Sequence, residues 1–244
     1  MKSILTEKVF LSSYKLKKFG KYALEKLGIK FPIYPNPNLA KIVSYITFDG
    51  HLSSKKNLFY LSSGSVDDLK EFRKLIKETF RVKGKIIKTE GNEFGVSYKF
   101  LVLNKPVCRI LELIGTPKGS KTNTIFDVPL WIVNHPENSL AYLNVAFKCE
   151  GSIWKEGKRN MKVRFKIHKS EELIENGINF MNTLKRMLLK HNIGTSNVWL
   201  ISENVTKTGI TKGICFNVLS RDIPLLNKKI WGCYDVGLGR RTKS

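Results

Sequence analysis

The chain repeats one unusual pattern, and this duplication limits what it can fold into more than any other feature. An apolar segment, predicted to be helical over 39–48, ends at Asp49-Gly50, and a second one over 140–149 ends at Glu150-Gly151. The same order of elements follows each of them, so each copy reads helix, strand, helix, two strands and helix. The sequence therefore predicts two related halves.

The remaining elements follow from hydrophobic periodicity. In the first copy we expect strands over 58–62, 83–89 and 96–102 and helices over 67–80 and 107–114. In the second copy we expect strands over 161–168, 198–204 and 214–218 and helices over 173–188 and 223–230. One further strand in each half is too weak to identify.

The copies define four segments of the chain. Residues 1–37 are a basic, helix-rich extension that ends in a proline cluster, FPIYPNP, which no helix interior tolerates. We expect the first repeat over 38–121, a linker over 122–138 and the second repeat over 139–244.

The net charge narrows the partners. The 244 residues include 43 Lys and Arg against 20 Asp and Glu, so the formal net charge is +23. Hydrophobic residues make up 42% of the chain, enough for a core in each half, so the charge does not indicate a disordered tail. A compact chain with this charge repels itself, and a polyanionic partner relieves the cost. An acidic-protein binder or an enzyme of neutral metabolites is therefore disfavoured, which leaves DNA, RNA or an anionic membrane surface.

Targeting signals and cysteine usage indicate the compartment. No segment resembles a signal peptide or approaches the roughly 20 apolar residues of a membrane span, so we expect no membrane partner. The four cysteines, Cys108, Cys149, Cys215 and Cys233, are far apart and form no CxxC pair. We therefore expect reduced thiols in a cytoplasmic protein.

The predicted strand over 161–168 has one cationic and one apolar face, because Lys162, Arg164, Lys166 and His168 alternate with Val163, Phe165 and Ile167. Such a sheet packs on helices with one face and contacts phosphates with the other. By the same alternation we expect a DNA-facing set that comprises Lys83, Lys85, Lys162, Arg164, Lys166 and Lys212. Trp154, Trp199 and Trp231 are expected in the core or at its rim.

The two acids at helix ends point to metal chemistry. Carbonyls at a helix C-terminus are unpaired and carry partial negative charge, so a carboxylate there is disfavoured unless a cation joins it. A divalent ion would bind the carboxylates of Asp49 and Glu150 and the last helical carbonyls, those of Phe48 and Cys149. Gly50 and Gly151 are expected to end the helices in the left-handed conformation. Two carboxylates that share divalent metals beside a basic sheet suit phosphodiester hydrolysis.

Residues 39–51, LAKIVSYITFDGH, resemble the first motif of a LAGLIDADG homing endonuclease, and residues 139–153, SLAYLNVAFKCEGSI, resemble the second. The segments IGTPKGSK over 114–121 and VPLWI over 128–132 are similar to the stretch that precedes the second motif in archaeal and organellar members. The resemblance covers the chain from residue 39 to its C-terminus.

The resemblance implies an α+β fold with two pseudo-symmetric αββαββα halves. In that fold saddle-shaped antiparallel sheets flank a central interface of the two motif helices. It further implies a monomer that binds a long, pseudo-symmetric site on double-stranded DNA. Members cut both strands with Mg²⁺ or Mn²⁺ and leave 3′ overhangs, whereas Ca²⁺ is expected to bind without supporting cleavage. The family's last motif acid maps onto Asp49 and Glu150, one for each strand.

The sequence departs from the family pattern within the motifs. Thr47 and Lys148 stand where the family has an earlier acid, and Phe48 and Val145 are bulky where small residues are usual. These changes leave both metal acids in place.

The family also places one basic residue of each half near the scissile phosphates. Lys99 and Lys212 lie in roughly corresponding strand regions and are the candidates for this catalytic role.

The leading hypothesis is a free-standing, site-specific DNA endonuclease encoded within an intron. The chain lacks the terminal Cys or Ser and His-Asn residues of a self-splicing intein, which disfavours that form. One alternative is a maturase on the same fold, with intron RNA as its partner. Another is a DNA-binding regulator without catalysis, which retention of Asp49 and Glu150 disfavours.

Overall fold

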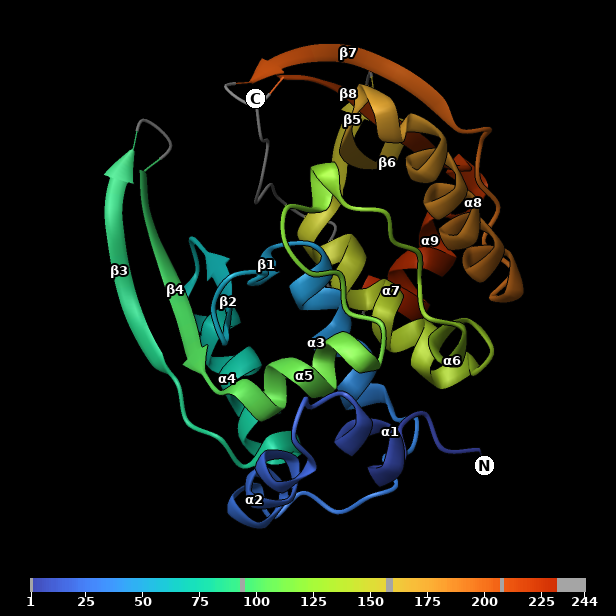
Figure 1. Ribbon diagram of the computed structural model, residues 1–244. Coiled ribbons are helices and arrows are strands. Elements are labelled where there is room, and N and C mark those ends of the chain that lie inside the picture. Colours follow the sequence, from blue (N-terminus) through green and yellow to red (C-terminus); the bar gives the residue numbers. More distant parts are fainter. Residues whose placement is uncertain (1, 93–94, 157–159, 207–208, 232–244) are drawn as a thin grey trace. The chain divides into compact units, whose positions relative to one another are not determined.

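The computed structural model describes residues 2–92, 95–156, 160–206 and 209–231. Contacts divide the chain into two compact units, Met1–Gly119 and Ser120–Ser244. Each unit contains one four-stranded antiparallel sheet with helices packed on it (Figure 1).

The first unit opens with two short helices and continues as an αββαββα half. Its elements are α1 (Glu7–Ser12), α2 (Lys17–Leu27), α3 (Pro37–Thr47), β1 (Gly50–Leu52), β2 (Leu58–Ser63), α4 (Val66–Phe80), β3 (Lys85–Asn92), β4 (Gly95–Leu103) and α5 (Lys105–Leu113). The strand order in its sheet is β1-β2-β4-β3.

The second unit repeats this order of elements. It contains η1 (Lys121–Asn123), α6 (Leu130–Val133), α7 (Pro136–Glu150), β5 (Gly151–Glu156), β6 (Asn160–Ser170), η2 (Glu171–Leu173), α8 (Ile174–Lys190), β7 (Trp199–Thr206), β8 (Gly209–Val218), η3 (Ser220–Asp222), α9 (Ile223–Leu226) and η4 (Asn227–Trp231). Its strand order, β5-β6-β8-β7, matches that of the first sheet position by position. The predicted α+β class is confirmed, and β1 and β5 are the strands that the sequence was too weak to identify.

Both motif helices begin earlier than predicted, at a proline. α3 begins at Pro37 and α7 at Pro136, because proline lacks the N–H that the first helical turn leaves unpaired and has its φ preset for the helix. The Oδ1 of Asn36 caps α3 and accepts a hydrogen bond from the backbone N–H of Leu39 at 2.9 Å.

Aromatic rings fill the core of the first unit. Phe72 of α4 packs against Tyr45 of α3, Phe59 of β2 and Phe100 of β4, with ring centroids 5.4, 6.5 and 5.9 Å away. All of these side chains are buried. One face of the sheet therefore packs against the helices, and the other face takes no part in this core.

The second core repeats this arrangement. Phe165 of β6 packs against Phe147 of α7 and Phe216 of β8, with centroids 5.1 and 5.7 Å away. Helix α8 covers the same face so closely that a Cβ on Gly177 would lie 2.9 Å from Cγ of Lys169.

Lys169 holds the segment before α6 against the second sheet. Its buried Nζ donates hydrogen bonds to the carbonyl oxygens of Lys121 and Thr124, at 2.9 and 2.6 Å, and lies 3.9 Å from the ring centroid of Phe126. Burial lowers the pKa of Lys169 to about 8, because desolvation penalises its charged form.

The helices before α3 pack on α5. Tyr14 lies beneath Lys105 and Arg109 of α5, with each cation 5.8 Å from its ring centroid, whereas Phe19 and Tyr22 of α2 are exposed. Over the parts of the chain that the structure describes, no helix is both long and apolar enough to cross a bilayer.

Candidate functional site

Asp49 lies at the junction between α3 and β1. Helix α3 ends at Thr47 with Phe48 as its C-cap, and β1 begins at Gly50. The carbonyl oxygen of Asp49 accepts a hydrogen bond from the N–H of Ser62 at 3.2 Å. Asp49 therefore extends the ladder between β1 and β2 by one residue, and the sheet fixes its backbone.

Glu150 occupies the matching junction of the second unit. It is the last residue of α7, and Gly151 is the first residue of β5. Gly50 pairs with Leu61 of β2, and Gly151 pairs with Phe165 of β6. Both acids thus come directly before the glycine that opens the first strand of a sheet.

The two glycines are needed for space, and the expected left-handed conformation is wrong. Gly50 is absent from the positive-φ residues of the described chain, and Gly151 has φ −72° and ψ 133°. A Cβ on Gly50 would lie 2.7 Å from the carbonyl oxygen of Tyr60 and 2.8 Å from Cα of Ile46. A Cβ on Gly151 would collide with the carbonyl oxygen of Phe147. At each junction between the helix and the following strand, only a residue without a side chain fits.

The donor chemistry at these junctions suits a hard divalent cation. Asp49 and Glu150 offer carboxylate oxygens, and Phe48 and Cys149 offer backbone carbonyls at the helix ends. Within the described ranges, no three His, Cys, Asp or Glu side chains gather into a metal site. Mg²⁺ is commonly bound by one or two carboxylates, and water and substrate phosphates complete its shell.

The register of the first sheet places Lys99 in the same row as Asp49. Ser62, which donates to the carbonyl of Asp49, pairs with Lys99 of β4. Neighbouring strands lie about 4.8 Å apart, so the backbones of Asp49 and Lys99 are separated by about 10 Å. The predicted catalytic candidate Lys99 thus lies two strands away from the acid.

In the second sheet, the same row contains Lys166. Gly151 pairs with Phe165, and Phe165 pairs with Phe216. The adjacent row, which begins at Glu150, therefore contains Lys166 and its partner Cys215. Cys215 is therefore the positional counterpart of Lys99, and Lys166 that of Ser62. The cation in the row of Glu150 comes from β6.

Lys99 and Lys212 lie on corresponding strands, β4 and β8, but not at corresponding positions along them. Lys212 pairs with the buried Lys169, on the side of the sheet that α8 covers. Its Nζ lies 3.3 Å from Glu171 and 3.0 Å from Glu203, and hydrogen bonds to these two carboxylates raise its pKa. Because side chains alternate along a strand, Lys212 lies on the other face of the sheet from Lys162, Arg164 and Lys166.

Each sheet has an open face, defined as the side away from its core helices. In the first unit this face carries His51, Tyr60 and Lys99 from three adjacent strands. The rings of His51 and Tyr60 are stacked with centroids 5.3 Å apart, and Nζ of Lys99 lies 5.1 Å from the Tyr60 centroid. Lys85, at the start of β3, pairs with Leu101 on the same side, whereas Lys83 precedes the strand.

The open face of the second unit carries the alternating cations Lys162, Arg164 and Lys166. Nζ of Lys162 lies 3.2 Å from Glu156. Burial raises the pKa of Cys215, and the positive charges of Arg164 and Lys166 partly oppose this rise.

Two of the three tryptophans that were expected in the core or at its rim, Trp154 and Trp199, lie on this open face. The guanidinium carbon of Arg164 is 4.9 Å from the ring centroid of Trp154 and 5.7 Å from that of Trp199. Trp231 instead packs edge-on against Phe147, with centroids 6.0 Å apart.

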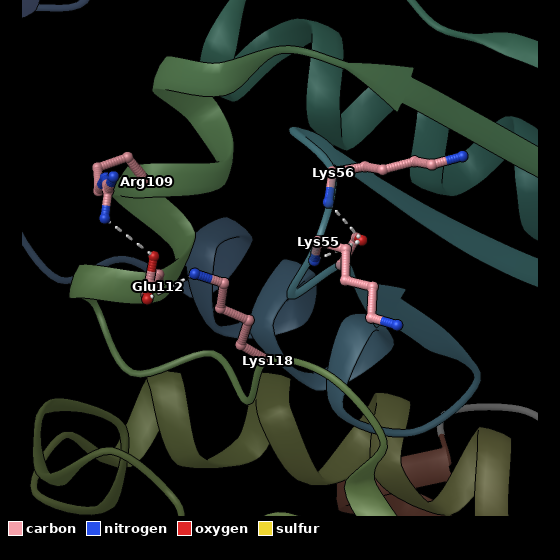
Figure 2. Close-up of polar contacts among 6 residues, drawn as sticks. Lys55, Lys56, Arg109, Glu112 and Lys118 are labelled. Carbon is pink, nitrogen blue, oxygen red and sulfur yellow. Dashed lines mark hydrogen bonds and ion pairs between the residues drawn. The ribbon is translucent and has the colours of Figure 1, made fainter.

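Sequence reasoning missed a lysine pair in the turn between β1 and β2. Ser53 Oγ accepts hydrogen bonds from the backbone N–H groups of Lys55 and Lys56, at 3.3 and 3.0 Å, and both lysine side chains are exposed (Figure 2). Nearby cations of α5 and the following segment are held by Glu112 in ion pairs with Arg109 and Lys118. A Ser-Ser-Lys-Lys-Asn turn directly after the first motif was the signal available.

Comparison with known proteins finds relatives of much greater length. No family model matches the sequence. A match of 28% identity over 186 residues joins it to the tRNA-splicing ligase RtcB of Pyrococcus abyssi, covering 71% of this chain and 20% of that protein. Another, of 30% identity over 173 residues, joins it to the DNA-directed RNA polymerase subunit Rpo1N of Methanocaldococcus jannaschii, covering 64% and 13%. The chain thus spans a fifth or less of these relatives.

Solved structures match over most of both chains. A structure of the homing endonuclease I-DmoI has a TM-score of 0.52 and 15% identity, covering 81% of this chain and 97% of its own. The homing endonuclease I-WcaI bound to its DNA recognition sequence has a TM-score of 0.52 and 11% identity, covering 95% and 96%. An I-DmoI variant with nicked target DNA, in the presence of manganese, has a TM-score of 0.51 and 15% identity, covering 81% and 97%. The chain therefore has the fold of the LAGLIDADG homing endonucleases.

Proposed function

We propose that this protein is a site-specific, metal-dependent DNA endonuclease that cuts both strands of a long duplex site and leaves 3′ overhangs. One observation carries the proposal. Both units place an acid directly before the glycine that opens their first strand, and both place a lysine in the row of that acid. A duplex needs two cuts, and the chain carries this junction once in each unit.

The charge distribution supports duplex DNA as the substrate. The chain has a net charge of +23, and the open faces carry Lys85, Lys99, Lys162, Arg164 and Lys166. Lysine and arginine on one face of a sheet can neutralise the phosphates of a groove. Two solved homing endonucleases with this fold are bound to their DNA targets, which supports the same partner here.

In this proposal each junction works on one strand. Asp49 in the first unit and Glu150 in the second would each offer a carboxylate to a divalent ion, with the carbonyls of Phe48 and Cys149 as further oxygen donors. A bound Mg²⁺ or Mn²⁺ supplies Lewis-acid activation of water and offsets the charge on the leaving 3′ oxygen. Lys99 and Lys166 neutralise the phosphate beside each acid, and Lys166 replaces Lys212 in this role because of the register.

The relatives support the view that this chain is a genetically mobile module, that is, a segment that can insert into different host genes. The matched segments lie within proteins that are named for different activities, a tRNA-splicing ligase and an RNA polymerase subunit. A module of one kind shared by such different hosts is more simply an insertion than a part of either activity. This agrees with an endonuclease that spreads its own coding sequence. Independently of these relatives, we propose that this chain is encoded within an intron.

The test is cleavage of a plasmid library that contains intron-insertion junctions, with and without Mg²⁺. We expect wild-type protein with Mg²⁺ to linearise a subset of plasmids. Asp49→Asn should cut at or below about 1% of that rate, since lost electrostatic stabilisation of this kind costs roughly 10²- to 10³-fold.

The matched control is Asp67→Asn, which removes the same charge from an exposed carboxylate that pairs with Lys70 at 2.9 Å. It should cut at the wild-type rate. Full-rate cutting by Asp49→Asn would refute the acid assignment. No cutting of any junction, combined with tight binding of folded intron RNA, would favour the maturase alternative, and sequence-specific DNA binding without cutting would favour the regulator.

A further inference from the structure

The guanidinium of Arg164 is held from several directions on the open face of the second sheet. Trp154 comes from β5, on one side of β6, and Trp199 comes from β7, beyond β8. The guanidinium carbon lies within cation–π range of both rings, at 4.9 and 5.7 Å. Nε also donates a hydrogen bond to Oδ1 of Asn217, its direct partner across β6 and β8, at 3.3 Å.

Among the described residues, no carboxylate contacts the two terminal amino groups of the guanidinium. No carboxylate among the described residues forms an ion pair with Arg164, whereas Lys162 on the same strand face pairs with Glu156 at 3.2 Å. The described contacts use Nε and the ring faces, so both terminal amino groups keep donors for a ligand.

Such fixation is more than a phosphate contact requires. A phosphate contact needs only a positive charge nearby, and Lys166, two residues after Arg164 on the same strand face, supplies it. Two partly exposed indoles and an asparagine instead hold the guanidinium, which matters where a ligand must meet two donors at a set spacing. In a duplex, the O6 and N7 of guanine in the major groove present that pair of acceptors.

We infer that Arg164 is a base-reading residue that selects a guanine at one position of the DNA target, with Trp154, Trp199 and Asn217 as its positioning residues. The inference rests on the proposed function, because it takes duplex DNA as the substrate. It assigns the two indoles to orienting the arginine, since paired bases in a duplex present no free face for stacking.

The first unit has a tyrosine at the position that corresponds to Arg164, so we expect the two half-sites to be read differently. Gly50 pairs with Leu61 and Gly151 with Phe165, which makes Tyr60 the positional counterpart of Arg164. Tyr60 is stacked with His51 and lies beneath Lys99. The guanine selected through Arg164 should therefore have no symmetry mate in the other half-site.

The test selects bound duplexes from a randomised DNA library with full-length protein and reads the base preference at each position. Wild-type protein should show one guanine that Arg164→Lys loses, with a drop of about 10- to 100-fold in preference at that position. Affinity for random duplex and its salt dependence should stay unchanged, because Lys keeps the charge. A matched control, Lys166→Gln, should weaken all sequences alike, lower the salt slope by about 1 and keep the guanine.

The positioning residues give a second readout that is independent of the arginine itself. Trp154→Ala should weaken the guanine preference with Arg164 still present, and Trp154→Phe should restore most of it, while circular dichroism melts verify that the variants fold. The inference is overturned if Arg164→Lys keeps the wild-type preference at every position. It is also overturned if Trp154→Ala weakens binding of single-stranded RNA and leaves the DNA preference intact. A wild-type protein that selects no sequence would overturn the proposed function as well.

Discussion

At the scale of single residues, the register of each sheet decides which lysines lie near the acids. Lys99 could be identified from the sequence as a strand lysine after the first motif, and the structure places it in the row of Asp49. Its counterpart could not, because the loop lengths in the two halves differ and shift the numbering. A strand shifted by one residue also turns every side chain to the opposite face. The register puts Cys215, and not Lys212, at the position that corresponds to Lys99, and we propose that Lys166 acts in place of Lys212.

This reassignment predicts different effects for two lysines of the second sheet. Lys166→Met should slow single-turnover cleavage by about 10²-fold at saturating protein, because it removes the charge nearest the row of Glu150. Lys212→Met should cut at nearly the wild-type rate, since Lys212 pairs with Glu171 and Glu203. A larger effect at Lys212 than at Lys166 would contradict the register argument.

Lys169 should give the protein a measurable dependence of stability on pH. Its folded pKa of about 8 lies below the ordinary 10.5, so between these values the unfolded chain binds more protons. The free energy of unfolding should therefore rise with pH across this window. Lys212, the charged group that pairs with Lys169 across the strands, is neutralised by its two glutamates.

The measurement is urea unfolding of wild-type protein and Lys169→Met at pH 7.5, 9 and 10. Wild-type protein should gain stability relative to the variant as the pH rises. A constant difference between the two proteins would show that Lys169 titrates with its ordinary pKa.

At the scale of elements, the turn from motif helix to first strand depends on glycine through space. The left-handed conformation that we expected for both glycines is wrong. A glycine that ends a helix is most often left-handed, and here it is required for space instead. The close approach of Gly50 to the carbonyl oxygen of Tyr60 comes from β2, which no local pattern reveals. The strands β1 and β5 were missed on the same grounds: β1 spans three residues, Gly50–Leu52, and tertiary pairing defines both.

Gly50→Ala should therefore destabilise the protein by about 1–3 kcal/mol, the usual cost of forcing atoms into a packed site. All three nearest atoms, within 2.9 Å of the added Cβ, are backbone atoms, which cannot rotate away. Gly64→Ala is the matched control, because nothing lies within 4 Å of its Cβ and its φ is ordinary. Thermal unfolding should show no more than about 0.5 kcal/mol for the control. Equal stability of the two variants would refute the packing argument.

At the scale of the whole molecule, the +23 charge divides into groups with different roles. Lys169 and Lys212 serve the second unit itself, and Lys70 and Lys74 form ion pairs along α4. The order of elements and the α+β class could be predicted from sequence, because hydrophobic periodicity and the repeat carry them. Which cations are available for a partner could not, because it depends on pairings between residues far apart in the chain.

The salt dependence of DNA binding should separate these groups. Wild-type affinity for duplex DNA should fall steeply with NaCl, and Lys85→Gln combined with Lys166→Gln should lower the slope of log K against log salt by about 2. Lys70→Gln combined with Lys74→Gln removes the same charge from α4 and should leave the slope unchanged. Equal slopes for both double variants would show that DNA binding depends on the net charge alone and not on these particular lysines.

The most direct test of the central claim is to map the cut ends on a duplex labelled separately on each strand. On a denaturing gel, wild-type protein with Mg²⁺ should cut each strand at one position, offset so that short 3′ overhangs result. Chelation of the metal by EDTA should abolish both cuts. Cuts that persist without metal, or that fall on one strand alone, would contradict an endonuclease with one acid junction for each strand.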